Sequence, residues 1–125
     1  MDALINIREA SFGYRKKSRD FFVLKNISCS FRAGEFVGIV GINGSGKSTL
    51  FRSIAGLQPT LEGVIEIEGT RLKEISLENL SKKISISLTE KIQGFNLTTF
   101  DLVSAGQIPF TNSFHQLKNE NLEVK

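Results

Sequence analysis

The sequence predicts an α/β fold in which antiparallel strands come first and the start of a parallel-sheet core follows. Three observations carry this prediction. Residues 23–31 alternate apolar and polar side chains, which is typical of a strand with one buried face. Residues 36–40, FVGIV, are apolar on both faces, as expected of a strand inside a parallel sheet. A glycine-rich loop and an amphipathic helical pattern come directly after that run.

Composition places the chain among ordinary globular domains. It has 125 residues, of which 40% are hydrophobic and 23% charged. Sixteen Lys and Arg against thirteen Asp and Glu give a net charge of +3, which suits an anionic ligand. Because no stripe of basic residues with interleaved aromatics is present, nucleic-acid binding is not predicted. The short basic run at residues 15–19 is expected to be a solvated loop.

Cysteine usage and the N-terminus bear on the cellular compartment. Cys29 is the sole cysteine, which excludes a disulfide within the chain and fits a reducing compartment. Its alternation with Ile27 and Phe31 predicts a buried small hydrophobe. Residues 1–10 lack an apolar core of signal-peptide length, and the longest apolar run is far too short for a membrane span. We therefore expect a cytosolic chain that reaches a membrane only by docking onto a partner.

The first elements expected are strands at residues 4–7 and 23–31, joined by the polar hairpin loop GYRKKSRD. The turn RAGE then leads into residues 36–40. A helix is expected from about Lys47, with Leu50, Ile54 and Leu57 on one stripe. Gly56 and Pro59 provide its stop signals.

Further elements follow in the second half of the chain. GVIEIEGT predicts a half-exposed strand that ends at Gly69, and a short helix is expected from Ser76. Residues 84–88, ISISL, alternate as a further strand. A helix is expected from near Thr98 to Gly106, and a weakly patterned tail starts at Pro109.

The loop at residues 41–48, GINGSGKS, fits the pattern G-x-x-x-x-G-K-[ST]. Its glycines let consecutive N–H groups point into one concavity, which binds phosphate oxygens, and the helix behind adds donors and the positive end of its dipole. Lys47 would reach the β- and γ-phosphates and the Ser48 hydroxyl would ligate Mg²⁺. A chance glycine-rich turn is the alternative, but a two-sided apolar strand before the loop and an amphipathic helix after it favour the phosphate loop. The residues expected to hold the nucleotide in this loop are Gly41, Asn43, Gly44, Ser45, Gly46, Lys47, Ser48 and Thr49.

At this point the sequence resembles the ATP-binding-cassette (ABC) ATPases over most of its length. VGIVGINGSGKSTLFRSIAGLQPTLEGVIEIEGTRL is similar to that family's Walker A segment, including the AGL.P..G.I...G run after the helix. Upstream, EASFGY resembles the family's A-loop, whose aromatic residue stacks on adenine, and this position is Tyr14. A packing role would also suit a lone tyrosine near a strand end, but the F-G-Y spacing before VLKNIS favours stacking.

The resemblance extends to the cassettes of iron-siderophore, haem and cobalamin importers. NLTTFDLVSAGQIPFTNSF is similar to a segment of those proteins, with Gln107 where Arg is usual and Phe110 where Tyr is usual. The family's Q-loop glutamine, which ligates Mg²⁺, should end the strand ISISLT, but Thr89 occupies that position and Gln93 lies four residues on. Thr89 is carried as a candidate metal ligand on this alignment. The hydroxyl of Thr89, the side chain of a folded-back Gln93 or a water molecule would each complete the coordination shell of Mg²⁺.

Several family motifs do not occur in this sequence. The signature LSGGQ, the Walker B aspartate, the catalytic glutamate and the switch histidine normally lie further along, and His115 stands too early to be that histidine. No catalytic residue is therefore assigned here, and we expect an N-terminal portion or truncated product. The strands that would flank residues 36–40 would also come from the missing part, leaving apolar faces exposed.

The resemblance implies a P-loop NTPase fold of the ABC type, with an antiparallel β-subdomain and the start of a parallel RecA-like core. It implies ATP and Mg²⁺ as ligands, a transmembrane permease and a second copy of the ATPase as partners, and a place on the cytoplasmic face of the inner membrane. A soluble ABC protein without a membrane partner and a non-catalytic nucleotide-binding fragment remain the alternatives. The segments expected are the β-subdomain with its A-loop (1–35), the strand, Walker A loop and helix (36–58), strands and a short helix (63–88), the Q-loop region (89–97) and the start of a helical subdomain (98–125).

Overall fold

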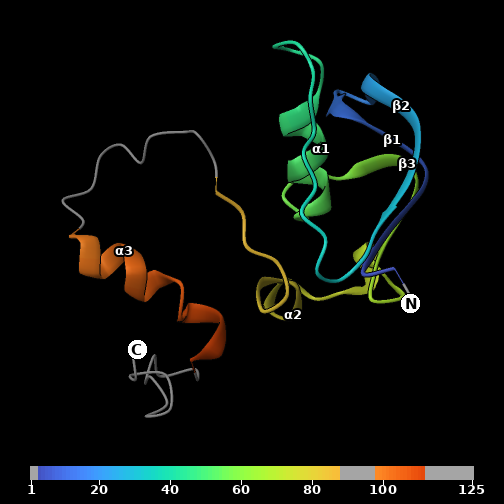
Figure 1. Ribbon diagram of the computed structural model, residues 1–125. Helices are drawn as coiled ribbons and strands as arrows, with labels where there is room; N and C mark the ends of the chain where they lie inside the picture. The colour runs from blue at the N-terminus through green and yellow to red at the C-terminus, as the bar shows by residue number, and fades with distance from the viewer. Residues whose placement is uncertain (1–2, 88–97, 112–125) are drawn as a thin grey trace. The chain divides into compact units, whose positions relative to one another are not determined.

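The computed structural model of the chain describes residues 3–87 and 98–111. It forms two compact units, residues 1–80 and 81–125. The first unit is built on a four-stranded sheet of order β2-β1-β3-β4 in which every neighbouring pair is antiparallel (Figure 1). The strands are β1 (Ile5–Lys16), β2 (Arg19–Phe31), β3 (Thr60–Ile67) and β4 (Thr70–Arg71). This confirms the predicted antiparallel subdomain.

The hairpin of β1 and β2 is much longer than predicted. Most of the segment expected to be a polar loop is paired, with Tyr14 opposite Phe21 and Arg15 opposite Asp20. Only Lys17 and Ser18 form the turn, and both have positive φ, of 45° and 65°. Two positive values at the tip are typical of the tight turns that match strand twist. The loop prediction was wrong because the polar side chains point to solvent from a strand instead of from a loop.

A bidentate ion pair stabilises the end of this hairpin. Arg15 donates to the two carboxylate oxygens of Asp20 at 2.7 and 3.0 Å, and these hydrogen bonds lower the pKa of Asp20. The basic residues around it are exposed, as the sequence suggested, although they belong to strand ends and a two-residue turn.

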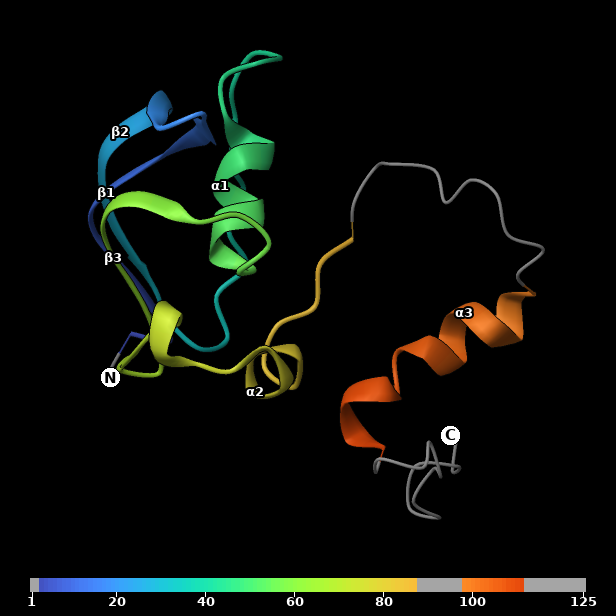
Figure 2. The ribbon, with the colours of Figure 1, turned by 180° about the vertical axis from the view of Figure 1, so that it is seen from behind.

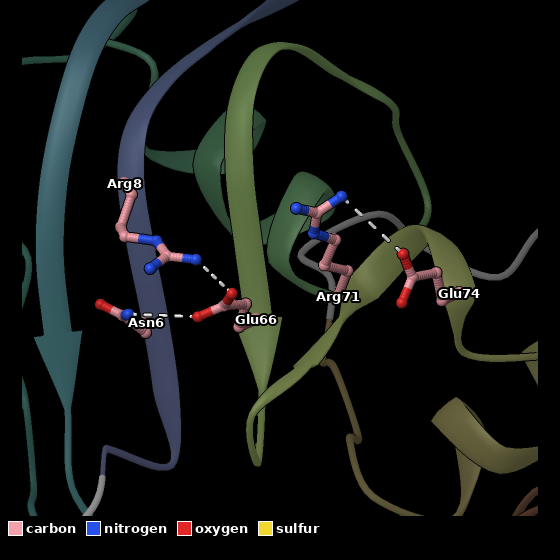
Figure 3. Close-up of polar contacts among 5 residues, drawn as sticks. All are labelled: Asn6, Arg8, Glu66, Arg71 and Glu74. Carbon is pink, nitrogen blue, oxygen red and sulfur yellow. Dashed lines mark hydrogen bonds and ion pairs between the residues drawn. The ribbon is translucent and has the colours of Figure 1, made fainter.

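Polar side chains also fix the register between β1 and β3. Glu66 of β3 accepts from Arg8 and from Asn6 on the neighbouring strand, the latter at 3.3 Å (Figure 3). Gly63 allows the two backbones to approach closely, because a Cβ there would lie 2.3 Å from the carbonyl oxygen of Glu9. Its φ of +76° is a second reason for glycine at this position.

The core lies between the sheet and α1 (Lys47–Ile54), which packs against one side of the curved strands (Figures 1 and 2). Its buried apolar members come from β1, β3 and α1, and other side chains, Cys29 among them, pack around it. Cys29 is partly buried, less than predicted, and this burial raises the pKa of its thiol, in keeping with the predicted role as a small hydrophobe. The buried members are Ile7, Ala10, Phe12, Leu50 and Ile65.

Helix α1 begins and ends close to where the sequence placed it. Gly46 is its N-cap and Ala55 its C-cap. Beyond the cap, Gly56 donates to the carbonyl of Ser53 and Leu57 to that of Arg52, with φ of +71° at Gly56. This pair of hydrogen bonds is a Schellman motif, which explains why the helix stops at the predicted glycine.

Two strands predicted from the sequence are not formed. Residues 36–40 and the described part of ISISL, 84–87, have no strand pairing. Phe36 and Val40 are fully exposed, and only Ile39 of this run packs against the core. Neither segment belongs to the sheet that the described strands form, so its backbone N–H and C=O groups join no strand ladder. The expected exposure of apolar side chains here is confirmed, while the strand assignment is wrong.

The remaining elements are short. A 3₁₀ turn (η1, Leu72–Glu74) and α2 (Leu77–Ser81) follow β4, and the Ser76 hydroxyl accepts from the backbone N–H of Asn79 at 3.3 Å. In the second unit, α3 (Thr99–Ala105) has a capping box between Thr98 and Asp101 and is followed by the 3₁₀ turn η2 (Ile108–Phe110). The predicted helices at Ser76 and Thr98 are thus confirmed. None of the helices described is long and apolar enough to cross a membrane.

Candidate nucleotide-binding site

The glycine loop leads directly into the first turn of α1. Gly46 has a φ of +97°, and its carbonyl accepts from Leu50 at 2.9 Å, which starts the helix. No N-cap side chain accepts from the first N–H groups, since the cap residue is a glycine. These N–H groups and the positive end of the helix dipole are therefore directed at whatever lies before the helix, an arrangement suited to phosphate.

Gly46 also lets the hairpin approach the loop. A Cβ at this position would lie 2.8 Å from Cγ of Leu24 and 2.9 Å from Cγ1 of Val23, both on β2. Only glycine meets both the positive φ and this close approach. The sequence pattern demanded a glycine here for phosphate binding, and the structure adds packing against β2 as a second reason.

The side chain of Lys47 curls back over the loop. Its ammonium donates to the carbonyl oxygens of Gly41 at 2.6 Å and Ile42 at 2.8 Å, and lies 3.5 Å from the Ser45 hydroxyl. Ser45 in turn donates its backbone N–H to the carbonyl of Ile42 at 3.2 Å. The lysine therefore holds its positive charge within the curve of the loop, next to the start of α1.

Tyr14 lies next to the start of α1, although it precedes Thr49 of that helix by 35 residues in the sequence. Its hydroxyl lies 3.3 Å from that of Thr49, in the first turn of α1. The Tyr14 ring is half exposed, with 51% of its surface accessible, whereas Thr49 is buried. The ring, the loop and the helix start share one open hollow of about 360 Å³. Its lining residues are Tyr14, Val23, Asn43, Gly44, Gly46, Lys47, Ser48 and Thr49.

Most residues proposed from the sequence thus meet in one hollow. Gly41 and Ser45 do not line it, but the Lys47 ammonium contacts the carbonyl of Gly41 and the hydroxyl of Ser45. Val23 lines it and was missed, although its apolar place in the alternation of β2 was visible in the sequence. Thr89, Gln93 and His115 lie outside the described residues.

The donor groups of the hollow fit a nucleoside triphosphate with Mg²⁺. An ammonium and a helix start suit phosphate oxygens, and the aromatic ring of Tyr14 suits a base. The Ser48 hydroxyl is the one metal ligand that the sequence assigned among the lining residues. Since Mg²⁺ bound to phosphates usually keeps several waters, one protein hydroxyl is compatible with such a site. No group of three His, Cys, Asp or Glu that would cage a metal exists in the part of the chain that the structure describes.

A second hollow, of about 300 Å³, lies between β3, η1 and α2. Its walls are mostly apolar, with Arg71 and Lys73 among the lining residues, and Arg71 lies 4.0 Å from Glu74 (Figure 3). Although Leu77, the first residue of α2, lines it, no glycine loop leads into that helix, so the lining does not supply the converging N–H groups that a triphosphate requires. The hollow beside Tyr14 is therefore the better candidate for a nucleotide.

Comparison with known proteins assigns the family. The sequence profile of the family described as ABC transporter matches residues 24–123. The chain belongs to the ABC transporter family. An uncharacterized ABC transporter ATP-binding protein of Methanocaldococcus jannaschii is 30% identical over 97% of this chain, and the match covers 40% of the relative.

Other relatives in the family carry the names of specific transporters. The methionine import ATP-binding protein of Bacillus subtilis is 35% identical over 75% of this chain and 27% of its own length. An energy-coupling factor transporter ATP-binding protein of Lactococcus lactis is 41% identical over 69% of this chain and 31% of its own length. The chain thus spans well under half the length of these relatives.

A solved structure supports the P-loop nucleotide-binding fold. A bacterial Atm1-family ABC exporter with ATP bound matches 61% of this chain and 13% of its own, with 32% identity and a TM-score of 0.54. ABC ATPases as a family use ATP with Mg²⁺, and their subunits generally pair with permeases. The sequence resemblance to an ABC ATP-binding protein is therefore confirmed, whereas these relatives do not support the resemblance to a particular importer class.

Proposed function

We propose that this chain binds ATP with Mg²⁺ as the N-terminal portion of the ATPase subunit of an ABC importer. The observation that carries the proposal is the single hollow shared by Tyr14, the glycine loop and the start of α1. A triphosphate placed against the loop would leave its base on the side where Tyr14 stands. No other described hollow offers an ammonium, a helix start and an aromatic ring together.

Each residue has a distinct role in the proposed complex. The N–H groups of residues 43–49 bind phosphate oxygens, and Lys47 neutralises the β- and γ-phosphates. Ser48 is a ligand of Mg²⁺, and Tyr14 and Val23 contact the base. Thr89 is retained as a proposed second ligand of the metal on the alignment alone. These groups bind and orient the nucleotide, and hydrolysis in the whole protein would require further groups to position water.

The wider assignment follows the family and one segment of the sequence. We propose a membrane permease and a second copy of the ATPase as partners, at the cytoplasmic face of the inner membrane. NLTTFDLVSAGQIPFTNSF supports iron-siderophore, haem or cobalamin complexes as cargo. Uptake of each labelled compound in a strain that lacks the gene tests this. Loss of one uptake supports the cargo class, and unchanged uptake of all three rejects it.

The phosphate assignment is tested with Lys47→Ala in the 125-residue chain. Titration calorimetry should show at least a tenfold loss of affinity for both ATP-Mg and inorganic triphosphate, because a charge-assisted contact of about 1.5–3 kcal/mol disappears. Lys73→Ala removes the same charge from the other hollow and should leave affinity unchanged. Equal affinity of the wild type and Lys47→Ala for ATP would reject the proposed site.

The base assignment is tested with Tyr14→Ala. Stacking of a base on an aromatic ring is worth about 1–3 kcal/mol, so ATP affinity should fall several-fold or more while triphosphate affinity stays constant. Phe51→Ala removes an exposed aromatic from α1 that does not line the hollow, and it serves as the control. Equal losses of affinity for ATP and for triphosphate would indicate that Tyr14 serves packing and does not stack on the base.

A further inference from the structure

The strand that carries Tyr14 is poorly supported by the sheet at the point where the tyrosine stands. Pairing of β1 with β3 ends at Phe12 opposite Thr60, and beyond it Gly13 and Tyr14 pair only with β2. A two-stranded ribbon is at best marginally stable without further packing. The position of the Tyr14 ring therefore depends on contacts from outside the sheet.

Two side chains provide such contacts, one within α1 and one just past its end. The hydroxyl of Thr49, in the first turn of α1, lies 3.3 Å from that of Tyr14. The side-chain amide of Gln58, just past the end of α1, donates to the carbonyl oxygen of Gly13. One contact holds the tip of the ring and the other holds the backbone next to it.

Thr49 is well suited to fix a ring. It is buried, with 5% of its surface exposed, and its branched side chain has few rotamers in a helix. Its hydroxyl points across to β1, while the half-exposed ring of Tyr14 keeps a surface on the hollow. The helix that begins the phosphate site thus also determines where the aromatic ring lies.

We propose that Thr49 and Gln58 are positioning residues that hold Tyr14 in place for the base of the nucleotide. This inference rests on the proposed function, and it assigns the Thr49 hydroxyl a role in recognising the base. The main alternative is that this hydroxyl acts on a phosphate. The two roles differ in which ligand loses affinity when the hydroxyl is removed.

The first experiment compares ATP with inorganic triphosphate on Thr49→Val, which keeps the branched shape and removes the hydroxyl. We expect ATP affinity to fall about two- to tenfold, the range for one hydrogen bond, with triphosphate affinity unchanged. Thr49→Ser should restore ATP affinity. Tyr14→Phe should cause a similar loss and add nothing in a Thr49→Val background, because both changes remove the same contact. Equal loss of ATP and triphosphate affinity, or additive losses, would overturn the inference.

A second experiment needs no nucleotide. Tyr14 is the sole tyrosine of the chain and tryptophan is absent, so tyrosine fluorescence reports on this ring alone. Thr49→Val and Gln58→Met should lower its fluorescence anisotropy, while Thr70→Val on β4 should not. Circular dichroism confirms that each variant keeps the fold. Unchanged anisotropy in both variants would overturn the inference.

The two experiments separate this inference from the proposed function. A wild type that binds neither ATP nor triphosphate would reject the nucleotide site, whereas the anisotropy would still show whether Thr49 and Gln58 hold the ring. A wild type that binds both ligands, with no selective effect in Thr49→Val, would reject only the positioning role.

Discussion

Strand β3 and the segment 36–42 look alike in sequence and differ in the structure. Both are rich in apolar side chains, and the sequence predicts a strand within each, at GVIEIEGT and at residues 36–40. β3 lies between β1 and β4 and buries Ile65 and Ile67, whereas residues 36–42 pair with no described strand and expose Phe36 and Val40. An apolar pattern makes a strand possible, and a partner strand decides whether it forms.

Helix α3 sharpens this comparison. It forms as predicted although none of its residues is buried, because the backbone hydrogen bonds of a helix join residues of the same segment. Its capping box adds local hydrogen bonds from Thr98 and Asp101. Local signals therefore suffice for a helix where they did not suffice for a strand.

The largest expected difference between the two regions is in the stability lost when a phenylalanine is replaced by alanine. Phe12→Ala on β1 removes a fully buried ring and should lower the free energy of unfolding by about 3–5 kcal/mol. Phe36→Ala removes a fully exposed ring and should change it by less than about 0.5 kcal/mol. Urea unfolding followed by circular dichroism measures both. A large loss in Phe36→Ala would mean that residues 36–42 are packed in solution.

Replacing a glycine by alanine should also lower the stability more in β3 than in residues 36–42, although the difference should be smaller than for phenylalanine. Gly63→Ala places a Cβ against the backbone of β1 at a positive φ, and should lower stability by about 2 kcal/mol or more. Gly38→Ala meets nothing within 4 Å, so a change of only a few tenths of a kcal/mol is expected. The same urea series measures both variants. Similar losses at the two glycines would contradict the view that only β3 is held closely by a neighbour.

The smallest effect should come from the cap of α3. Thr98→Ala removes the acceptor of the Asp101 N–H and should destabilise the helix by about 1 kcal/mol, detected as faster hydrogen exchange at Asp101 and Leu102. Ser104→Ala, inside the same helix, should not speed this exchange. Equal exchange in Thr98→Ala and the wild type would show that α3 does not depend on its cap.

The same cap should respond to acid. Hydrogen bonds from the Thr98 side chain and backbone lower the pKa of Asp101. A carboxyl whose folded pKa is lowered contributes stability above its unfolded pKa, near 4, and this is lost as pH falls through the folded value. Helix protection should therefore be full at neutral pH and decline below about pH 4 in the wild type. Asp101→Asn should remove that decline.

Much of the candidate site could be predicted from the sequence. The spacing of glycines, Lys47 and Ser48 places the phosphate loop at a helix start, and the structure has α1 begin at Lys47. A short motif of this kind works locally, because glycine conformations and a helix N-terminus need few distant contacts. The contacts of Tyr14 with Thr49, of Val23 with the hollow and of Gln58 with Gly13 could not be predicted in this way. They depend on how a long hairpin packs against α1.

The sequence by itself determined the antiparallel alternation of residues 23–31 and 63–67, the limits of three helices and the glycine loop, since each depends on neighbours within a few positions. Only the tertiary structure decided the length and register of the β1–β2 hairpin, the failure of residues 36–40 and 84–87 to form strands, and the meeting of Tyr14 with the loop. The physical reason is that strand pairing and side-chain contact join residues that are far apart in the chain. A local pattern supplies the chemical groups, and their partners become fixed only when distant segments pack together.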